Sequence, residues 1–165
     1  MKRLLLVVLV ALSLPGCGLH PLYAGGASGP IASGLAGVEV APVAGKSGYL
    51  VTNALRDRLP RRSGGTAAYR LEIVLDDQIT GLGVRRDDTV TRERRTLRAR
   101  YQLVSLGNGE VVLDATAGSD AGVDVVGSEY ATIAAENTAL ERLSDIVADQ
   151  IVTRVALYIR RAPAR

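Results

Sequence analysis

The segment VTRERRTLRARYQLVSL, residues 90–106, has the alternation of a β-strand with two unlike faces. One set of alternate positions is apolar and comprises Leu97, Ala99, Tyr101 and Leu103. The other set is basic and comprises Arg92, Arg94, Arg98 and Arg100. Successive side chains of a strand point to opposite faces of a sheet. The segment therefore predicts a long strand whose sheet is covered on one face and open on the other.

The segments on either side predict two more strands. Before it, Leu71, Ile73 and Leu75 alternate with other residues, and a weaker pattern continues to Val84. The phase shifts near Asp76-Asp77, which predicts a bulge or bend. After it, Gly107-Asn108-Gly109 is typical of a hairpin turn. A third alternating segment follows the turn, with Val111, Leu113 and Ala115 on one face.

Two helices and a short first strand complete the expected domain. Val38, Val40 and Val43 predict a strand that Pro42 confines to a sheet edge or a strand end. Ser47 is a candidate N-cap for a helix over about 47–59, which ends before Pro60. Ser128 is a candidate N-cap for a helix over about 128–160, whose apolar residues advance by three, four or seven.

This element order, β-α-β-β-β-α, predicts an α+β fold. We expect a two-layer sandwich, with two helices packed on one face of a four-stranded sheet. The domain should span residues 38–162. Residues 18–37 are rich in Gly, Ala, Ser and Pro without a period. We therefore expect an extended tether over 17–37, after a cleaved segment over 1–16.

The N-terminus has the features of a bacterial lipoprotein signal peptide. Lys2 and Arg3 precede an apolar run over 4–14, which as a helix would span about 16 Å, roughly half of a bilayer core. The sequence Leu14-Pro15-Gly16-Cys17 then resembles a lipobox. We expect Cys17 to be acylated, so that the chain is held on a membrane.

Composition excludes several classes of protein. The 165 residues include one Cys and one His, which argues against a disulfide scaffold, a zinc site and a Cys/His or Ser/His/Asp catalytic set. The net charge of +3 falls to +1 without Lys2 and Arg3, since 18 basic residues then face 17 acidic ones. We expect no enzyme activity, no cofactor, no metal and no nucleic-acid partner.

Three short patterns have plain structural interpretations. Gly45-Lys46-Ser47 lies where a phosphate-binding loop would lie, but Val40 stands where that motif requires Gly, so a helix cap explains it. The doublets Asp76-Asp77 and Asp87-Asp88 are interpreted as turn residues. His20 is interpreted as a solvated tether residue.

Several motifs resemble the lipopolysaccharide-assembly lipoprotein family, LptE, in its alphaproteobacterial form. They are Cys17-Gly18-Leu19-His20-Pro21-Leu22-Tyr23 and the C-terminal runs over 128–136 and 154–158. The resemblance implies a lipoprotein on the periplasmic face of the outer membrane. It also implies a domain that plugs a large LptD-like β-barrel, assists assembly of that barrel and binds lipopolysaccharide. Only Cys17 carries over as an individual residue.

The arginines supply a candidate contact surface. Residues 85–100 hold seven arginines, and guanidinium groups suit bidentate contacts with phosphate. The candidate contacts with lipopolysaccharide or an acidic barrel wall are Arg85, Arg86, Arg92, Arg94, Arg98 and Arg100. A solvated strand face, or an edge charged against strand pairing, remains an alternative. A generic outer-membrane adaptor for peptidoglycan or another envelope protein is the alternative function.

Overall fold

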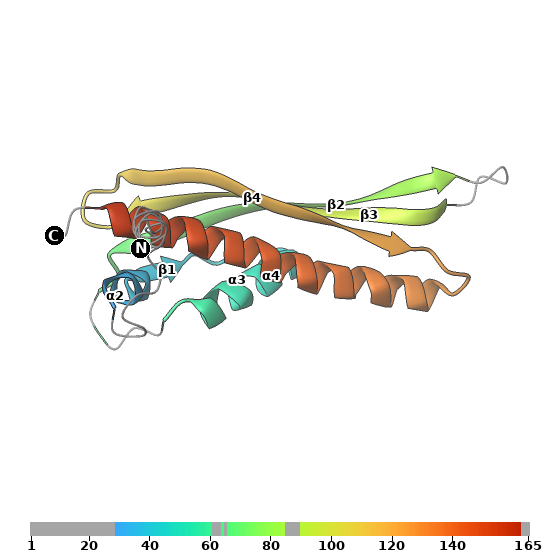
Figure 1. Ribbon diagram of the computed structural model, residues 1–165, viewed down its shortest axis with the longest axis horizontal. Helices are drawn as coiled ribbons and strands as arrows, with labels where there is room; N and C mark the ends of the chain where they lie inside the picture. Colours follow the sequence, from blue (N-terminus) through green and yellow to red (C-terminus); the bar gives the residue numbers. More distant parts are fainter. Residues whose placement is uncertain (1–28, 61–63, 65, 85–89, 163–165) are drawn as a thin grey trace, which may run out of the picture.

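The computed structural model describes residues 29–60, 64, 66–84 and 90–162. The sheet has the order β1-β2-β3-β4, and β1 is parallel to β2 while the other pairs are antiparallel. Its strands are β1 (Val38–Val40), β2 (Tyr69–Val84), β3 (Val90–Ser105) and β4 (Val111–Asp124). The helices are α2 (Pro30–Ala36), α3 (Gly45–Arg58) and α4 (Glu129–Arg161). All three lie on the same side of the sheet (Figure 1), so the predicted α+β sandwich is confirmed.

The central strands pair over almost their whole length. The β2–β3 register runs without interruption from Tyr69↔Ser105 to Leu82↔Arg92. The bulge predicted near Asp76-Asp77 is therefore wrong, and so is the interpretation of that doublet as a turn. The irregularity lies instead between β3 and β4, at Leu103/Val104. A strand tolerates Asp77 on its inward face because Arg95 of β3 neutralises it.

The apolar alternate positions of β3 form the middle of the core, as predicted. Leu97, Ala99, Tyr101 and Leu103 are all at most 2% exposed. They pack in one cluster with residues of both long helices, among them Val51, Leu55, Leu143, Val147 and Ile151. Burying such side chains contributes about 1.5–3 kcal/mol each relative to exposure. The alternation in sequence thus decides which face of the sheet the helices cover.

The two predicted N-caps have different outcomes. Ser128 caps α4, and its hydroxyl accepts a hydrogen bond from the Ala131 N–H at 3.4 Å. Ser47 is not a cap, because α3 begins at Gly45 with Ala44 as N-cap and no side-chain cap bond. Its first turn closes against the preceding loop instead. A Cβ on Gly48 would lie 2.5 Å from the Val43 carbonyl oxygen, so this approach requires glycine.

Helix α2 lies in the segment that was predicted to be an extended tether. Pro30 is at its N-terminal position, where a missing N–H costs nothing, and Ile31 and Leu35 are buried. It packs close to α4: a Cβ on Gly34 would lie 2.4 Å from Ile159 Cγ2. The tether prediction is wrong for residues 30–36. This helix of about two turns has no apolar period of its own, and contact with α4 stabilises it. The predicted signal peptide and Cys17 lie outside the described residues.

Candidate functional site

The predicted basic face is the open face of the sheet. Arg92, Arg94, Arg98 and Arg100 are all exposed and lie opposite the helix-covered side. Val74 of β2 is 72% exposed and faces Arg100 across the strand pair. Arg85 and Arg86, the other two predicted contacts, lie outside the described residues. Four of the six candidate arginines therefore share one surface.

Strand β4 supplies acidic partners for three of these arginines. The antiparallel register places Asp124 directly opposite Arg92. Asp120 and Asp114 each lie two positions along β4 from the residues opposite Arg94 and Arg100, Gly122 and Thr116. The ion pairs are Arg92–Asp124 at 3.3 Å, Arg94–Asp120 at 4.0 Å and Arg100–Asp114 at 2.9 Å. Hydrogen bonds from Arg100 and then Gln102 hold the pKa of Asp114 below its ordinary value. The charges of three of the four exposed arginines are thus partly neutralised within the sheet, although exposed pairs of this kind are individually weak.

Arg98 differs from the other three. Its neighbour on β4 is Gly118, and Asp76, its neighbour on β2, accepts hydrogen bonds from Gln78. Among the described residues Arg98 forms no ion pair. A Cβ on Gly118 would lie 2.6 Å from Cδ and 2.8 Å from Nη1 of Arg98. The glycine therefore makes room for the arginine side chain to lie across β4.

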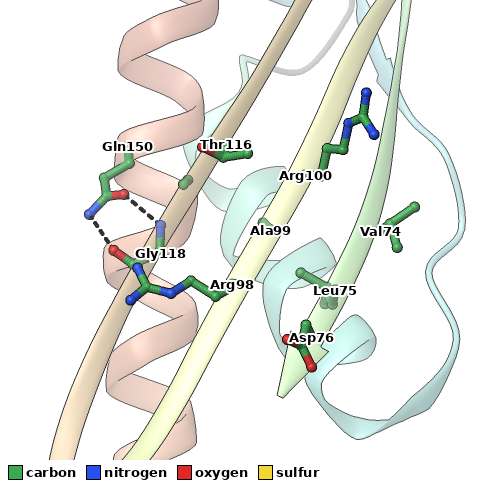
Figure 2. Close-up of a pocket in the computed structure, with 10 residues that line it drawn as sticks. Val74, Leu75, Asp76, Arg98, Ala99, Arg100, Thr116, Gly118 and Gln150 are labelled. Carbon is green, nitrogen blue, oxygen red and sulfur yellow. Dashed lines mark hydrogen bonds between the residues drawn. The ribbon is translucent and has the colours of Figure 1, made fainter. Parts of the chain in front are cut away.

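A shallow groove of about 540 Å³ surrounds Arg98 on the open face. Its side-chain lining includes Val74, Asp76, Arg98, Arg100, Thr116 and Gln150. In Figure 2 the Arg98 side chain extends toward Gly118, and Gln150 of α4 meets the same glycine. The Gly118 N–H donates to Gln150 Oε1 at 3.0 Å, and Gln150 Nε2 donates to the Gly118 carbonyl at 3.3 Å. The groove combines Arg98, which has no ion pair within the part of the chain that the structure describes, with the exposed apolar side chain of Val74. Because Arg98 extends toward Gly118 and away from Asp76 (Figure 2), its guanidinium group is presented to an amphipathic anion.

Arg95 belongs to the same arginine-rich segment but is not among the contacts predicted from the sequence. It lies on the helix-covered face and is 9% exposed. Its guanidinium donates to both oxygens of Asp77, at 2.9 and 2.7 Å, and to the Glu136 carbonyl of α4 at 3.0 Å. The hydrogen bonds with Asp77 raise the pKa of Arg95 above its ordinary value. Arg95 is two residues from Leu97 in the alternation of β3, and this spacing alone indicated that its side chain lies on the helix-covered face. Its role is to attach α4 to the sheet.

Within the described ranges, no group of three or more His, Cys, Asp or Glu side chains is arranged to hold a metal ion. Over those same residues, none of the helices combines the length and apolar character of a membrane span. What the geometry offers is a binding surface made of strand residues.

Comparison with known proteins identifies the family. The sequence model of LptE, described as lipopolysaccharide-assembly, matches residues 35–155, from the end of α2 into α4. The chain belongs to the LptE family. LptE proteins are non-catalytic accessory lipoproteins of lipopolysaccharide assembly, associated with the outer membrane and with the lipopolysaccharide-transport machinery. No curated protein sequence matches the chain.

Solved structures of bacterial lipoproteins share the LptE fold seen here. A protein from Caulobacter crescentus CB15, described as a lipoprotein, is 26% identical with a TM-score of 0.69 and covers 81% of this chain and 100% of its own. The rare lipoprotein B of Shewanella oneidensis is 10% identical with a TM-score of 0.57, and the match covers 73% of this chain and 92% of that protein. A minor lipoprotein of Acinetobacter baumannii is 14% identical with a TM-score of 0.56, and the match covers 78% of this chain and 93% of that protein. The latter two matches establish similarity of fold.

Proposed function

We propose that this protein is a lipid-anchored subunit of the lipopolysaccharide translocon, which plugs an LptD-like β-barrel, assists its assembly and binds lipopolysaccharide during delivery. Family membership over residues 35–155 supports the assignment to this machinery. Cys17, acylated after cleavage of residues 1–16, would hold the domain on the periplasmic face of the outer membrane. Two or three acyl chains on one cysteine are enough for durable attachment.

The observation that carries lipopolysaccharide binding is the guanidinium of Arg98, which has no ion pair among the residues that the structure describes. Lipid A combines phosphate groups with acyl chains, and a guanidinium fork binds phosphate through two charge-assisted hydrogen bonds. Arg92, Arg94 and Arg100 form ion pairs with aspartates of β4. Arg98 lies over Gly118 and forms no ion pair among the described residues, although Asp76 is its register partner on β2. Val74, 72% exposed, provides apolar surface in the same groove. We therefore propose that Arg98 is the main anion contact among the predicted arginines.

The test compares Arg98→Ala with Arg94→Ala, a matched exposed arginine of the same strand that already has an acidic partner. Binding of purified lipopolysaccharide is measured at low and at physiological salt. We expect Arg98→Ala to weaken binding at least fivefold and to reduce its salt dependence, because a phosphate contact is screened by ions. Arg94→Ala should change the affinity less than twofold. Equal effects of the two substitutions, with the fold intact, would disprove the special role of Arg98.

Affinity purification of the tagged lipoprotein from membranes tests the translocon assignment separately. Recovery of a stoichiometric β-barrel with bound lipopolysaccharide is the expected result. Co-sedimentation with cell-wall sacculi, without a barrel, would support a peptidoglycan adaptor instead. If Arg98→Ala lowers barrel recovery but leaves lipopolysaccharide binding unchanged, Arg98 contacts barrel carboxylates and not the lipid.

A further inference from the structure

Strand β2 has an outer edge that the rest of the described chain leaves unpaired. Strand β1 pairs with it only from Val38↔Tyr69 to Val40↔Leu71. After a last hydrogen bond from the Ala41 N–H to the Leu71 carbonyl, at 2.9 Å, the chain turns away at Pro42, which has no N–H to continue the ladder. Within the described residues no strand pairs with this edge from Glu72 to Val84. At about 3.3 Å per residue the unpaired edge is about 40 Å long.

The register identifies which backbone groups point outward. The Tyr69 N–H donates to Gly37 and the Leu71 carbonyl accepts from Ala41, so the odd residues of β2 face the outer edge. Even residues face β3, as the hydrogen bond from the Leu106 N–H to the Ala68 carbonyl indicates. Backbone groups alternate sides along a regular strand. The N–H and C=O groups of Ile73, Leu75, Asp77 and Ile79 therefore lie on the outer edge.

The opposite edge of the sheet is treated differently. On β4, Gln150 occupies both outward groups of Gly118, with hydrogen bonds of 3.0 and 3.3 Å. Helix α4 runs along this strand and supplies the glutamine (Figure 1). A covered edge cannot add another strand at that point. The two edges of one sheet thus differ in whether a helix side chain closes them.

The outer edge of β2 also lacks most of the usual features that prevent strand addition. Residues 72–84 contain no Pro, Lys or Arg, and their register with β3 shows no bulge. Their charges are all acidic, Glu72, Asp76 and Asp77, and Asp77 is paired with Arg95. Large apolar side chains are exposed on both faces beside the edge: Val74 is 72% and Ile79 is 44% exposed. Natural proteins normally protect a long edge with proline, charge, a bulge or a covering element. A regular edge whose charges are all acidic is a template for a strand that carries the opposite charge.

We propose that the outer edge of β2 receives an extended strand from a partner protein. A second copy of this chain is a poor occupant, because antiparallel pairing of two β2 strands about Gln78, the middle of the free edge, would make the two Asp77 residues diagonal neighbours. Pairing about Asp77 would place them directly opposite each other, and like charges across a strand pair are destabilising. Among the described residues Asp76 has no cationic contact and accepts only from Gln78. The strand that fits carries Lys or Arg beside Asp76 and an apolar residue beside Val74.

The test removes one outward N–H while leaving the rest of the sheet. Ile79→Pro deletes an edge donor, and proline is tolerated at strand edges whose N–H faces away from the ladder. Ile79→Thr keeps the N–H and a β-branched side chain, so it is the matched control. Tagged full-length variants are purified from native membranes. We expect Ile79→Pro to reduce recovery of the stoichiometric partner at least tenfold, and Ile79→Thr to change it less than twofold. Wild-type recovery with folded Ile79→Pro would overturn the proposal.

Hydrogen exchange gives an answer that needs no substitution. In the purified chain the amides of Ile73, Leu75, Asp77 and Ile79 should exchange quickly, while the even residues of β2 stay protected by β3. In the purified complex the same odd amides should become protected at least a hundredfold, and unchanged exchange there would overturn the proposal. A disulfide-linked homodimer formed by Gln78→Cys in membranes would overturn it in favour of a second copy.

The partner is expected within the translocon, so its identity rests on the proposed function. Different measurements would refute strand addition and the proposed function. Binding of purified lipopolysaccharide to Ile79→Pro should equal that of the wild type, since Ile79 does not line the Arg98 groove. Loss of partner recovery with normal lipopolysaccharide binding supports strand addition. A partner strand on β2 combined with no lipopolysaccharide binding by the wild type would instead refute the proposed function alone.

Discussion

The two ends of the sandwich share one sheet but are held together by different forces. At one end α2, α3 and α4 cover β1 to β4, and at the other α4 alone accompanies the long strands (Figure 1). Along the inward face of β2, exposure rises from 1% at Leu71 to 9% at Ile73 and 44% at Ile79. The alternation of side chains is the same throughout, so the number of covering helices determines how much of it is buried.

The chemistry of the inward face changes in the same direction. At the three-helix end the contacts are apolar, with Leu35, Leu55, Leu103 and Val155 at most 1% exposed. At the single-helix end Arg95 links Asp77 of β2 with the backbone of Glu136. A charged network can hold one helix where there is too little apolar area for a second core. The comparison predicts that the two ends respond differently to substitution.

The largest effect should come from the three-helix end. Leu103→Ala removes a fully buried side chain and should lower the free energy of unfolding by about 2–5 kcal/mol. Ile79→Ala, on the same face of the sheet at the other end, should cost less than about 1 kcal/mol because Ile79 is 44% exposed. Urea unfolding of both variants measures the difference. Equal losses would mean that the single-helix end has a core of its own.

The charged network should produce the next largest effect. Arg95→Met leaves Asp77 half-buried without its partner and should cost about 1–3 kcal/mol in urea unfolding. Hydrogen exchange should accelerate in the first turns of α4, while β1 and α3 stay protected. Arg95→Met combined with Asp77→Leu should recover part of the loss, because no buried charge is left unpaired. A double variant less stable than Arg95→Met would contradict this account.

A smaller effect should follow from the cap at the free end of α4. Ser128→Ala removes the acceptor of the Ala131 N–H and should destabilise the protein by about 0.5–1 kcal/mol. Ser128→Gly should cost only a few tenths of a kcal/mol. Thermal melting measures both, and amide exchange of the first turn of α4 locates the change. No difference between the two variants would show that the first turn is held by packing alone.

The smallest effect should appear as pH dependence at the single-helix end. Burial, and then the neighbouring Glu136, raise the pKa of Glu93 above its ordinary value of 4.5. The folded state therefore binds more protons than the unfolded state just above pH 4.5, and stability from this group falls as pH rises through that range. Glu93→Gln should raise the Tm relative to wild type at pH 7 more than at pH 4. Glu141→Gln, at an exposed acid of α4, is the control, and its effect on the Tm should be the same at pH 4 and pH 7.

The sequence predicted the elements whose residues carry their own pattern. The alternation over residues 90–106 correctly assigned the buried and open faces, and Ser128 correctly marked the start of α4. Helix α2 was missed because seven residues rich in small side chains have no period to read. The bend at Asp76-Asp77 was wrong because the partner that permits an aspartate inside a strand, Arg95, is on a different strand.

The candidate site divides in the same way. Local alternation determines that four arginines share a face, since side-chain direction in a strand follows from the backbone of that strand alone. Which arginine lacks an ion pair within the described ranges depends on tertiary pairing: aspartates of β4 reach Arg92, Arg94 and Arg100, whereas Arg98 lies over Gly118. Edge protection is likewise a tertiary property, because Gln150 reaches Gly118 from a distant helix. Periodicity is a local property of the chain, whereas pairing partners and free edges exist only once distant segments have come together.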